Sequence, residues 1–233
     1  MFDGKLKALT FSYDDGVVED VRFVELINKY NIRCTFNLNS NLFGTRNDFT
    51  WHEFFIPHLR LTKDQIGGLY DGHEIAAHTL NHLNLTTLKK EEIIKEVEED
   101  RINLSKIFDC EVVGFAYPCG GVNNDDRVAK VIKENTCVKY ARTIDFTYNF
   151  DMPTNLYRYN PTISHNDYDN IFRLAEEFVN LKPDSPKLFS IMGHSYELNM
   201  RDTWDKLEDL LKILSNREDI FYGTNKQVLL GEK

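Results

Sequence analysis

The chain has 233 residues, a formal net charge of −9 and 42% hydrophobic residues, enough to bury a sizeable core. The acidic balance argues against a nucleic-acid partner, because such binding depends on clustered Lys and Arg. The first residues contain no long apolar run, so we expect no signal peptide, no membrane span, a cytoplasmic location and reduced cysteines.

The expected elements alternate between strand-like runs and helical periodicity. The expected strands are 6–13, 34–38, 74–77, 112–117, 138–144, 187–192 and 220–222. The expected helices are 19–30, 62–72, 90–108, 126–134, 167–181 and 203–214, and the aromatic stretch 39–61 is an insertion. No linker or repeat divides the chain, so we expect one domain, 1–233. Repeated strand–helix units indicate an α/β fold with a parallel sheet, either a barrel or an open doubly wound sheet.

Three polar clusters follow expected strands. They are Ser-Tyr-Asp-Asp-Gly at 12–16, His-Thr-Leu-Asn-His at 78–82 and Gly-His at 193–194. Loops after the carboxyl ends of parallel strands gather on one face, so we expect the clusters to converge there. Together they supply two carboxylates and three imidazoles, which suffice to bind one divalent cation and to provide a base and an acid.

The spacing of these side chains predicts a catalytic metal site. His78 and His82 are four residues apart, and on a helical turn both would point toward one ion. Asp14 and Asp15 repel each other unless a cation or a shared proton separates them, although one could instead cap a helix. Two histidines and one carboxylate leave coordination positions open. The second carboxylate is then a candidate base, and His194 is a candidate acid unless its role is structural.

The clusters also resemble the motifs of a known family. Residues 10–16 (TFSYDDG) resemble the first motif of the polysaccharide deacetylase family, carbohydrate esterases of the chitooligosaccharide deacetylase type, and 78–82 match its H-[S/T]-x-x-H motif. Residues 115–120 (FAYPCG) and 191–194 (IMGH) resemble its third and last motifs. The resemblance implies a distorted (β/α) barrel with about seven parallel strands, an active site at their carboxyl ends and metal-dependent removal of an acetyl group from a sugar.

The resemblance also implies individual roles. Asp14 matches the base, His194 matches the acid that protonates the departing amine, and the backbone N–H of Cys119 matches the oxyanion contact. The implied ligands of one divalent metal are Asp15, His78 and His82. Zinc is the first candidate for that metal, with cobalt, nickel and manganese as alternatives.

The chain departs from the family pattern at two positions. Ala116 stands where the third motif carries an arginine that orients the catalytic Asp, and Cys119 stands in place of its tyrosine. The fourth motif has no clear match, so we expect Arg142 to supply the missing charge from the neighbouring strand. The expected substrate-binding residues are Trp51, Tyr117, Pro118, Cys119, Gly120 and Arg142.

Other residues receive a structural interpretation. Most aromatic residues of the insertion are expected to pack, with Trp51 as the candidate to line the substrate cleft. Cys119 as a nucleophile is a weaker alternative, because no separate histidine base remains for it. His73 is expected in a turn or near the metal ligands without binding the metal. Three histidines show no spacing that relates them to the other candidate site residues and are expected at the surface: His52, His58 and His165.

The leading hypothesis is a metal-dependent deacetylase of an N-acetylated saccharide or related small amide, acting on a small-molecule or oligosaccharide substrate, with a homodimer left open. A hydrolase of a non-sugar C–N bond and a non-catalytic carbohydrate-binding relative are the alternatives, because a fold does not fix a substrate. A non-haem iron oxygenase would use the same ligands, but strand–helix alternation conflicts with its all-β setting.

Overall fold

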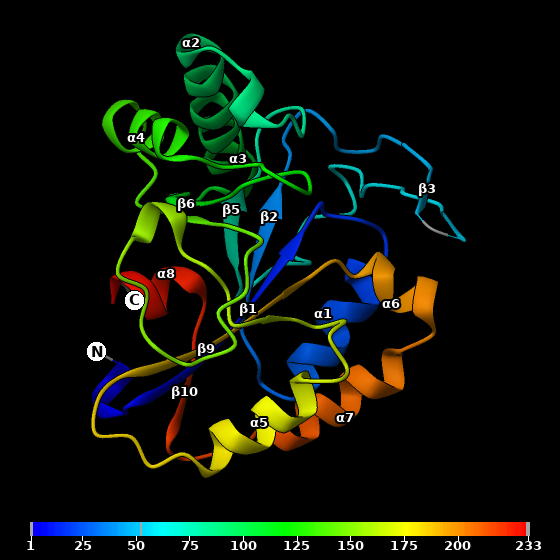
Figure 1. The fold of residues 1–233 in the computed structure, drawn as a ribbon. Helices are drawn as coiled ribbons and strands as arrows, with labels where there is room; N and C mark the ends of the chain where they lie inside the picture. The colour runs from blue at the N-terminus through cyan, green and yellow to red at the C-terminus, as the bar shows by residue number, and fades with distance from the viewer. Residues whose placement is uncertain (1, 52, 232–233) are drawn as a thin grey trace.

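The computed structural model describes residues 2–51 and 53–231. At its centre lies a parallel sheet in which seven strands follow the order β7-β6-β5-β2-β1-β9-β8 and β10 pairs with β1 (Figure 1). The strands are β1 (Lys7–Asp14), β2 (Cys34–Leu38), β5 (Glu74–Ala77), β6 (Gly114–Ala116), β7 (Tyr140–Arg142), β8 (Ile163–Ser164), β9 (Lys187–Gly193) and β10 (Ile220–Tyr222). The predicted parallel α/β architecture is therefore confirmed.

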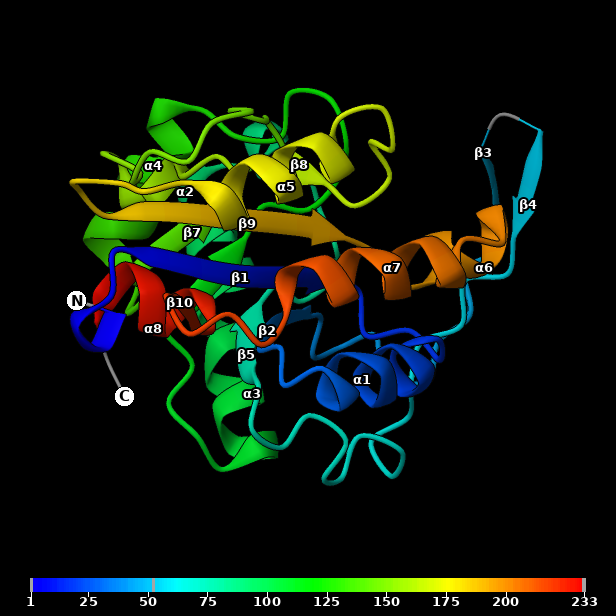
Figure 2. The ribbon, with the colours of Figure 1, turned by 90° about the horizontal axis from the view of Figure 1, so that it is seen from below.

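The helices are α1 (Asp20–Lys29), α2 (Lys90–Ile94), α3 (Asp100–Phe108), α4 (Asp126–Asn135), α5 (Ile171–Asn180), α6 (Tyr196–Arg201), α7 (Trp204–Leu214) and α8 (Asn225–Leu230). Helices such as α1, α3, α5 and α7 cover the outside of the sheet, whereas α8 lies on its inner side, where Asn225 hydrogen-bonds Thr10 and Ser12 (Figures 1 and 2). Between α2 and α3 the helix continues as a π-helical stretch, η3 (Lys95–Glu99). The predicted helix 90–108 is thus one continuous element with a π-helical middle.

The barrel is distorted, and an extended segment completes it. Tyr159 donates its backbone N–H to Ala141 of β7 at 3.0 Å, and Thr162 donates to Ser190 of β9 at 2.8 Å. The chain between these two contacts therefore bridges from β7, at one edge of the sheet, to β9 near the other edge. β10 pairs with the first residues of β1 while β2 pairs with the last ones, so β10 lies end to end with β2. The structure confirms the predicted distorted (β/α) barrel.

Burial explains why β1 lies at the centre. All eight of its residues are buried, because β2 and β9 flank it and helices cover its outer face. On its outer face, Tyr13 stacks on Phe23 of α1 with ring centroids 3.8 Å apart. Successive side chains of a strand point to opposite faces, so Ser12 and Asp14 share the opposite, inner side. A strand that is apolar outside and polar inside thus delivers Asp14 to the carboxyl end of the barrel.

The structure differs from prediction in the region before β5. Residues 62–72 form successive turns and not the predicted helix, although the Gln65 side chain accepts the backbone N–H of Thr62 at 2.9 Å as a capping box requires. Gly67 and Gly68 follow soon after, and Gly68 has φ +74°, a left-handed conformation that ends a right-handed helix.

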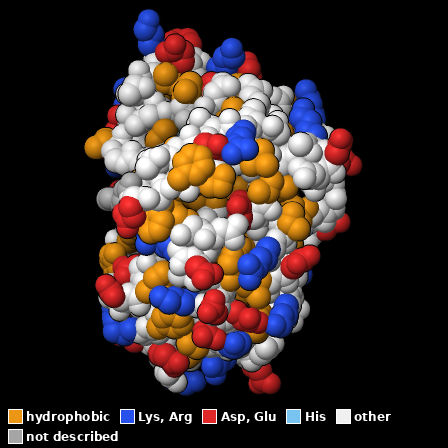
Figure 3. Space-filling model, turned by 90° about the vertical axis from the view of Figure 1, so that its right-hand side faces the viewer, with side chains coloured by type: hydrophobic (Ala, Val, Ile, Leu, Met, Phe, Trp, Pro, Cys, Tyr) orange, Lys and Arg blue, Asp and Glu red, His pale blue; other side chains and the backbone are white. Residues whose placement is uncertain are grey.

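Within the insertion, β3 (Phe49–Trp51) and β4 (Phe54–Ile56) form an antiparallel hairpin that periodicity did not predict. The hairpin projects away from the barrel beside α6 (Figure 2). Trp51 and Phe55 on it are 43% and 65% exposed. On the side of the molecule drawn in Figure 3, hydrophobic side chains lie among basic and acidic ones, which alternate over the lower part. Among the described residues, no helix is long and apolar enough to cross a membrane.

Candidate active site

Polar side chains from distant strands meet at the carboxyl end of the barrel. Asp14 ends β1, His78 follows β5, Arg142 ends β7 and His194 follows β9. Beside them lies a cavity of about 590 Å³. Its lining residues are Asp14, Asp15, Asn47, Phe49, Trp51, Ile56, His58, Arg60, His78, His82, Tyr117, Cys119, Gly120, Ile144, Phe146, Met192, His194, Tyr196 and Glu197.

Three of these side chains form a compact cluster of candidate metal ligands. One ligand atom from each of Asp15, His78 and His82 lies within 4.8 Å of the others. Asp15 Oδ1 is 3.4 Å from His82 Nε2 and 3.9 Å from His78 Nε2. The two histidines lie on a loop and not on the expected helical turn, with φ +68° at Thr79 and +57° at His82. The loop backbone, and not helical periodicity, brings the two rings together.

The donor atoms of this cluster suit a divalent cation such as zinc. His78 Nδ1 lies 2.9 Å from the carbonyl oxygen of Ala116, which can only accept, so Nδ1 carries the proton and the Nε2 lone pair faces the cluster. Burial lowers the pKa of His78 to about 4, which keeps the ring neutral. The backbone N–H of His78 donates to Asp100 at 2.9 Å, which holds the loop in place.

The Asp14 carboxylate is held by an arginine from another strand. One terminal nitrogen of Arg142 lies 2.5 Å from each oxygen of Asp14, and Asn37 Nδ2 donates to Oδ1 at 2.7 Å. Burial by itself raises the pKa of Asp14, but the Arg142 guanidinium, together with His194, outweighs it, so the net shift is downward. Ala116 of β6 and Arg142 of β7 are register partners. The chain thus places a guanidinium one strand away from the position where the family motif carries it.

His194 lies between two carboxylates. Its Nε2 is 3.8 Å from Asp14 Oδ2, and its Nδ1 is 3.4 Å from Glu197 Oε2. Burial lowers the pKa of His194, but Glu197, Asp14 and Asp15 outweigh it and raise the pKa to about 9. Glu197 was missed in the sequence. The signal that could have found it is its position three residues after His194, at the start of a helix.

His165 is not at the surface, as predicted, but 2% exposed behind this pair. Its Nε2 lies 3.0 Å from Glu197 Oε2, and its Nδ1 hydrogen-bonds the hydroxyl of Tyr13. A Cβ on Gly193 would lie only 2.4 Å from His165 Nδ1, so the glycine before His194 makes room for this ring. His165 was predicted wrongly because its partners come from distant elements, Tyr13 from β1 and Glu197 from α6.

The remaining histidines fall in three places. His58, also predicted at the surface, is 4% exposed and lies 3.1 Å from Asp15 Oδ2. His73 precedes β5, at the opposite end of that strand from His78, where it accepts the backbone N–H of Cys34 at 3.2 Å. His52 lies outside the described residues.

The expected substrate contacts divide into two groups. Four line the cavity: Trp51, Tyr117, Cys119 and Gly120. Pro118 and Arg142 are buried and do not line it, because Arg142 lies beneath Asp14. Burial, and then the charge of Asp15, raise the pKa of the Cys119 thiol, which disfavours the thiolate that a nucleophile requires.

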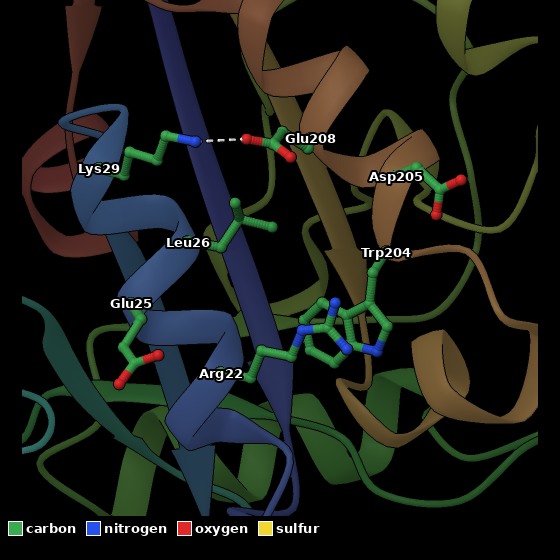
Figure 4. A pocket seen from close by; sticks show the side chains of 7 residues that line it. All are labelled: Arg22, Glu25, Leu26, Lys29, Trp204, Asp205 and Glu208. Carbon is green, nitrogen blue, oxygen red and sulfur yellow. Dashed lines mark hydrogen bonds and ion pairs between the residues drawn. The ribbon is translucent and has the colours of Figure 1, made fainter.

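A second cavity, of about 360 Å³, lies on the outside between α1 and α7 (Figure 4). Arg22 stacks over the ring of Trp204 at 4.3 Å, and Lys29 pairs with Glu208 at 2.6 Å. The seven side chains drawn there include no histidine, so this cavity offers nothing comparable to the Asp–His–His cluster.

Comparison with known proteins identifies relatives. Residues 3–137 match the family model for polysaccharide deacetylase. A family 4 carbohydrate esterase from Streptomyces lividans in complex with acetate superimposes with a TM-score of 0.58 at 12% identity, covering 94% of this chain and 93% of that one. No curated protein matches the chain.

Two further solved structures share the fold. The deacetylase PplD from Streptococcus pyogenes, in complex with acetate, gives a TM-score of 0.52 at 19% identity, covering 64% of this chain and 61% of that protein. The chain thus spans less than two thirds of that relative. A mutant of a family 4 pseudoenzyme with restored enzymatic activity gives 0.57 at 17% identity, covering 96% of this chain and 67% of its own.

Proposed function

Because the chain belongs to the polysaccharide deacetylase family, we propose that it is a metal-dependent hydrolase that removes an acetyl group from an N-acetylated saccharide or a related small amide. The observation that carries the proposal is the placement of three functional units around one cavity. These are the Asp14–Arg142 pair, the Asp–His–His cluster and the His194–Glu197 pair. Together they supply a base, a metal site and an acid.

The metal would be held by Asp15, His78 and His82, with zinc as the first candidate. A divalent cation at this position supplies Lewis-acid chemistry, polarising an acyl carbonyl and a water molecule. Three protein ligands leave coordination positions open, as in catalytic zinc sites. The neutral Nε2 atom of His78 is ready for such a ligand role without loss of a proton.

The protein groups then divide the proton transfers. Asp14, ionised because its pKa is lowered, accepts a proton from the attacking water. The backbone N–H of Cys119 stabilises the negative charge that develops on the acyl oxygen. His194, protonated at neutral pH because its pKa is raised to about 9, donates a proton to the departing nitrogen. Arg142 and Glu197 act as positioning residues for this base and this acid.

A non-sugar amide is the second candidate substrate, because the apolar part of the cavity lining admits it as well. That part consists of Phe49, Trp51 and Ile56 from the insertion and Ile144 and Phe146 from the loop after β7. Such a lining fits the apolar face of a sugar ring, and it fits equally the body of a small aromatic or aliphatic amide.

Metal analysis of the purified protein and an acetate-release screen test the proposal. The screen compares N-acetylated mono- and oligosaccharides with small non-sugar acetamides, using metal-free protein to which zinc, cobalt, nickel or manganese is returned. We expect release that depends on added metal and is lost in Asp14→Asn. Sugar binding without turnover would instead support a non-catalytic relative.

A further inference from the structure

His58 and Arg60 of the insertion contact the candidate metal ligand Asp15, although neither belongs to one of the family motifs. His58 Nε2 lies 3.1 Å from Asp15 Oδ2, and an Arg60 terminal nitrogen lies 3.3 Å from Oδ1. The other Arg60 terminal nitrogen is 3.2 Å from His58 Nδ1. The three side chains are between 4% and 6% exposed. An acidic group that is buried this deeply needs such partners to remain ionised.

These contacts define the tautomer of His58. A guanidinium only donates hydrogen bonds, so His58 Nδ1 must accept from Arg60. The ring proton therefore sits on Nε2, which donates to Asp15 Oδ2. The hydrogen bonds run in one direction, from Arg60 through His58 to Asp15. We call this chain of three groups the Asp15 relay.

The relay turns one particular oxygen of Asp15 toward the candidate metal position. Oδ2 accepts a hydrogen bond from His58, whereas Oδ1, which also accepts a longer one from Arg60 at 3.3 Å, is the oxygen that faces His78 and His82. Groups that hydrogen-bond a ligating carboxylate orient it, and losing them typically weakens metal binding by about 10- to 100-fold. Asp15 itself has φ +81°, so its own backbone conformation is uncommon and benefits from external support.

The relay is built into the fold and not a chance surface contact. Leu61 donates its backbone N–H to Gly16 at 2.9 Å, and Val18 donates to Leu59 at 3.0 Å. Residues 59–61 therefore run along the loop that carries Asp15. The His58 ring packs edge-on against Phe49 and Tyr196, with centroids 5.6 and 5.1 Å away. The ring therefore has little freedom to turn away from Asp15.

We infer that His58, with its tautomer set by Arg60, is a positioning residue that holds Asp15 as a single-oxygen ligand of the metal. This inference rests on the metal centre of the proposed function. It assigns a role to the long insertion beyond lining the cavity. The insertion supplies the two side chains that hydrogen-bond the candidate ligand Asp15.

Metal affinity tests the inference without any substrate. The full chain is stripped with a chelator, and the dissociation constants for Zn²⁺ and Co²⁺ are measured by competition with a chromophoric chelator. We expect His58→Ala to bind each ion about 10- to 100-fold more weakly. His58→Gln, which keeps an N–H at a similar reach, should stay within about threefold of the natural protein. His73→Ala is the matched control and should not change the affinity.

Two spectra separate positioning from direct ligation. The absorption spectrum of the Co²⁺-saturated protein should keep its shape in His58→Gln, which removes the imidazole but keeps a donor for Asp15 Oδ2, and the ring ¹⁵N shifts of the metal-free protein should place the His58 proton on Nε2. A changed cobalt spectrum in His58→Gln, a proton on Nδ1, or equal affinity in His58→Ala would each overturn the inference alone. A natural protein that binds neither ion would overturn the proposed function as well. Far-UV circular dichroism of the metal-free variants establishes that they are folded.

Discussion

Replacing Arg142 by methionine removes the guanidinium that holds the catalytic base while keeping an unbranched side chain of similar reach. Arg142 is fully buried, and Asp14 beneath the cavity is 2% exposed. Breaking a buried ion pair by removing one partner leaves the other charge without compensation and costs about 3–5 kcal/mol. We therefore expect Arg142→Met to lower the free energy of unfolding at neutral pH by roughly this amount.

The same substitution is expected to shift the pH dependence of catalysis. In the natural protein the pKa of Asp14 is lowered, so the carboxylate contributes stability that is present above its ordinary pKa and is lost as the pH falls through the lowered value. Without Arg142, burial dominates and the pKa of Asp14 rises. The acid limb of the kcat/KM profile should then move to higher pH, because Asp14 is protonated over a wider range.

Urea unfolding and pH profiles of kcat/KM, on the best substrate of the acetate-release screen, measure these two effects. Ala116→Arg combined with Arg142→Ala provides the rescue, because the two positions are register partners on strands that lie about 4.8 Å apart. The double variant should recover part of the activity that Arg142→Met loses. If Arg142→Met left both the acid limb of kcat/KM and the free energy of unfolding unchanged, the assigned role of Arg142 would be refuted.

Three further outcomes are expected. Glu197→Gln removes the carboxylate beside His194, so the pKa of His194 falls from about 9 and the alkaline limb of kcat/KM moves to lower pH; an unmoved limb would exclude this partnership. Burial raises the pKa of Asp20 to about 7, so the free energy of unfolding of the natural protein falls as the pH rises from about 4 to 7. In Asp20→Asn this decrease is absent, so the free energy of unfolding of the variant, measured in urea, should rise relative to that of the natural protein by up to about 4 kcal/mol over the same range. A pH-independent difference would contradict this assignment. Trp51→Ala should raise KM more than it lowers kcat in steady-state assays, and an unchanged KM would remove Trp51 from the substrate site.

Local sequence was sufficient to predict a parallel α/β sheet, and the family resemblance selected the distorted barrel over an open sheet. Strands such as 34–38 and 74–77 were predicted with the bounds that the structure shows. Short apolar runs between polar segments are typical of buried strands, so their limits can be read from the sequence. The position of Asp14, His78 and His194 after strands also predicted that they converge, since parallel strands end on the same side of a sheet.

Local sequence was less informative where a residue owes its role to a distant partner. The turns at 62–72 replaced a helix because two glycines ended it after a valid capping box. His58 and His165 have no periodic context that distinguishes them from surface histidines. Their burial depends on segments that pack against them from elsewhere in the chain.

The sequence alone therefore determined the fold class, the family resemblance and the residues that carry its main motifs. Arg142 was predicted to supply the missing charge, but only the tertiary structure decided that its guanidinium contacts both oxygens of Asp14 and that Glu197 supports His194 from a helix. The physical reason is that hydrogen-bond register and loop packing set which side chains meet. A charge can move to a neighbouring strand and still contact the same carboxylate, and the local sequence shows that such a residue is present but not which atoms it contacts.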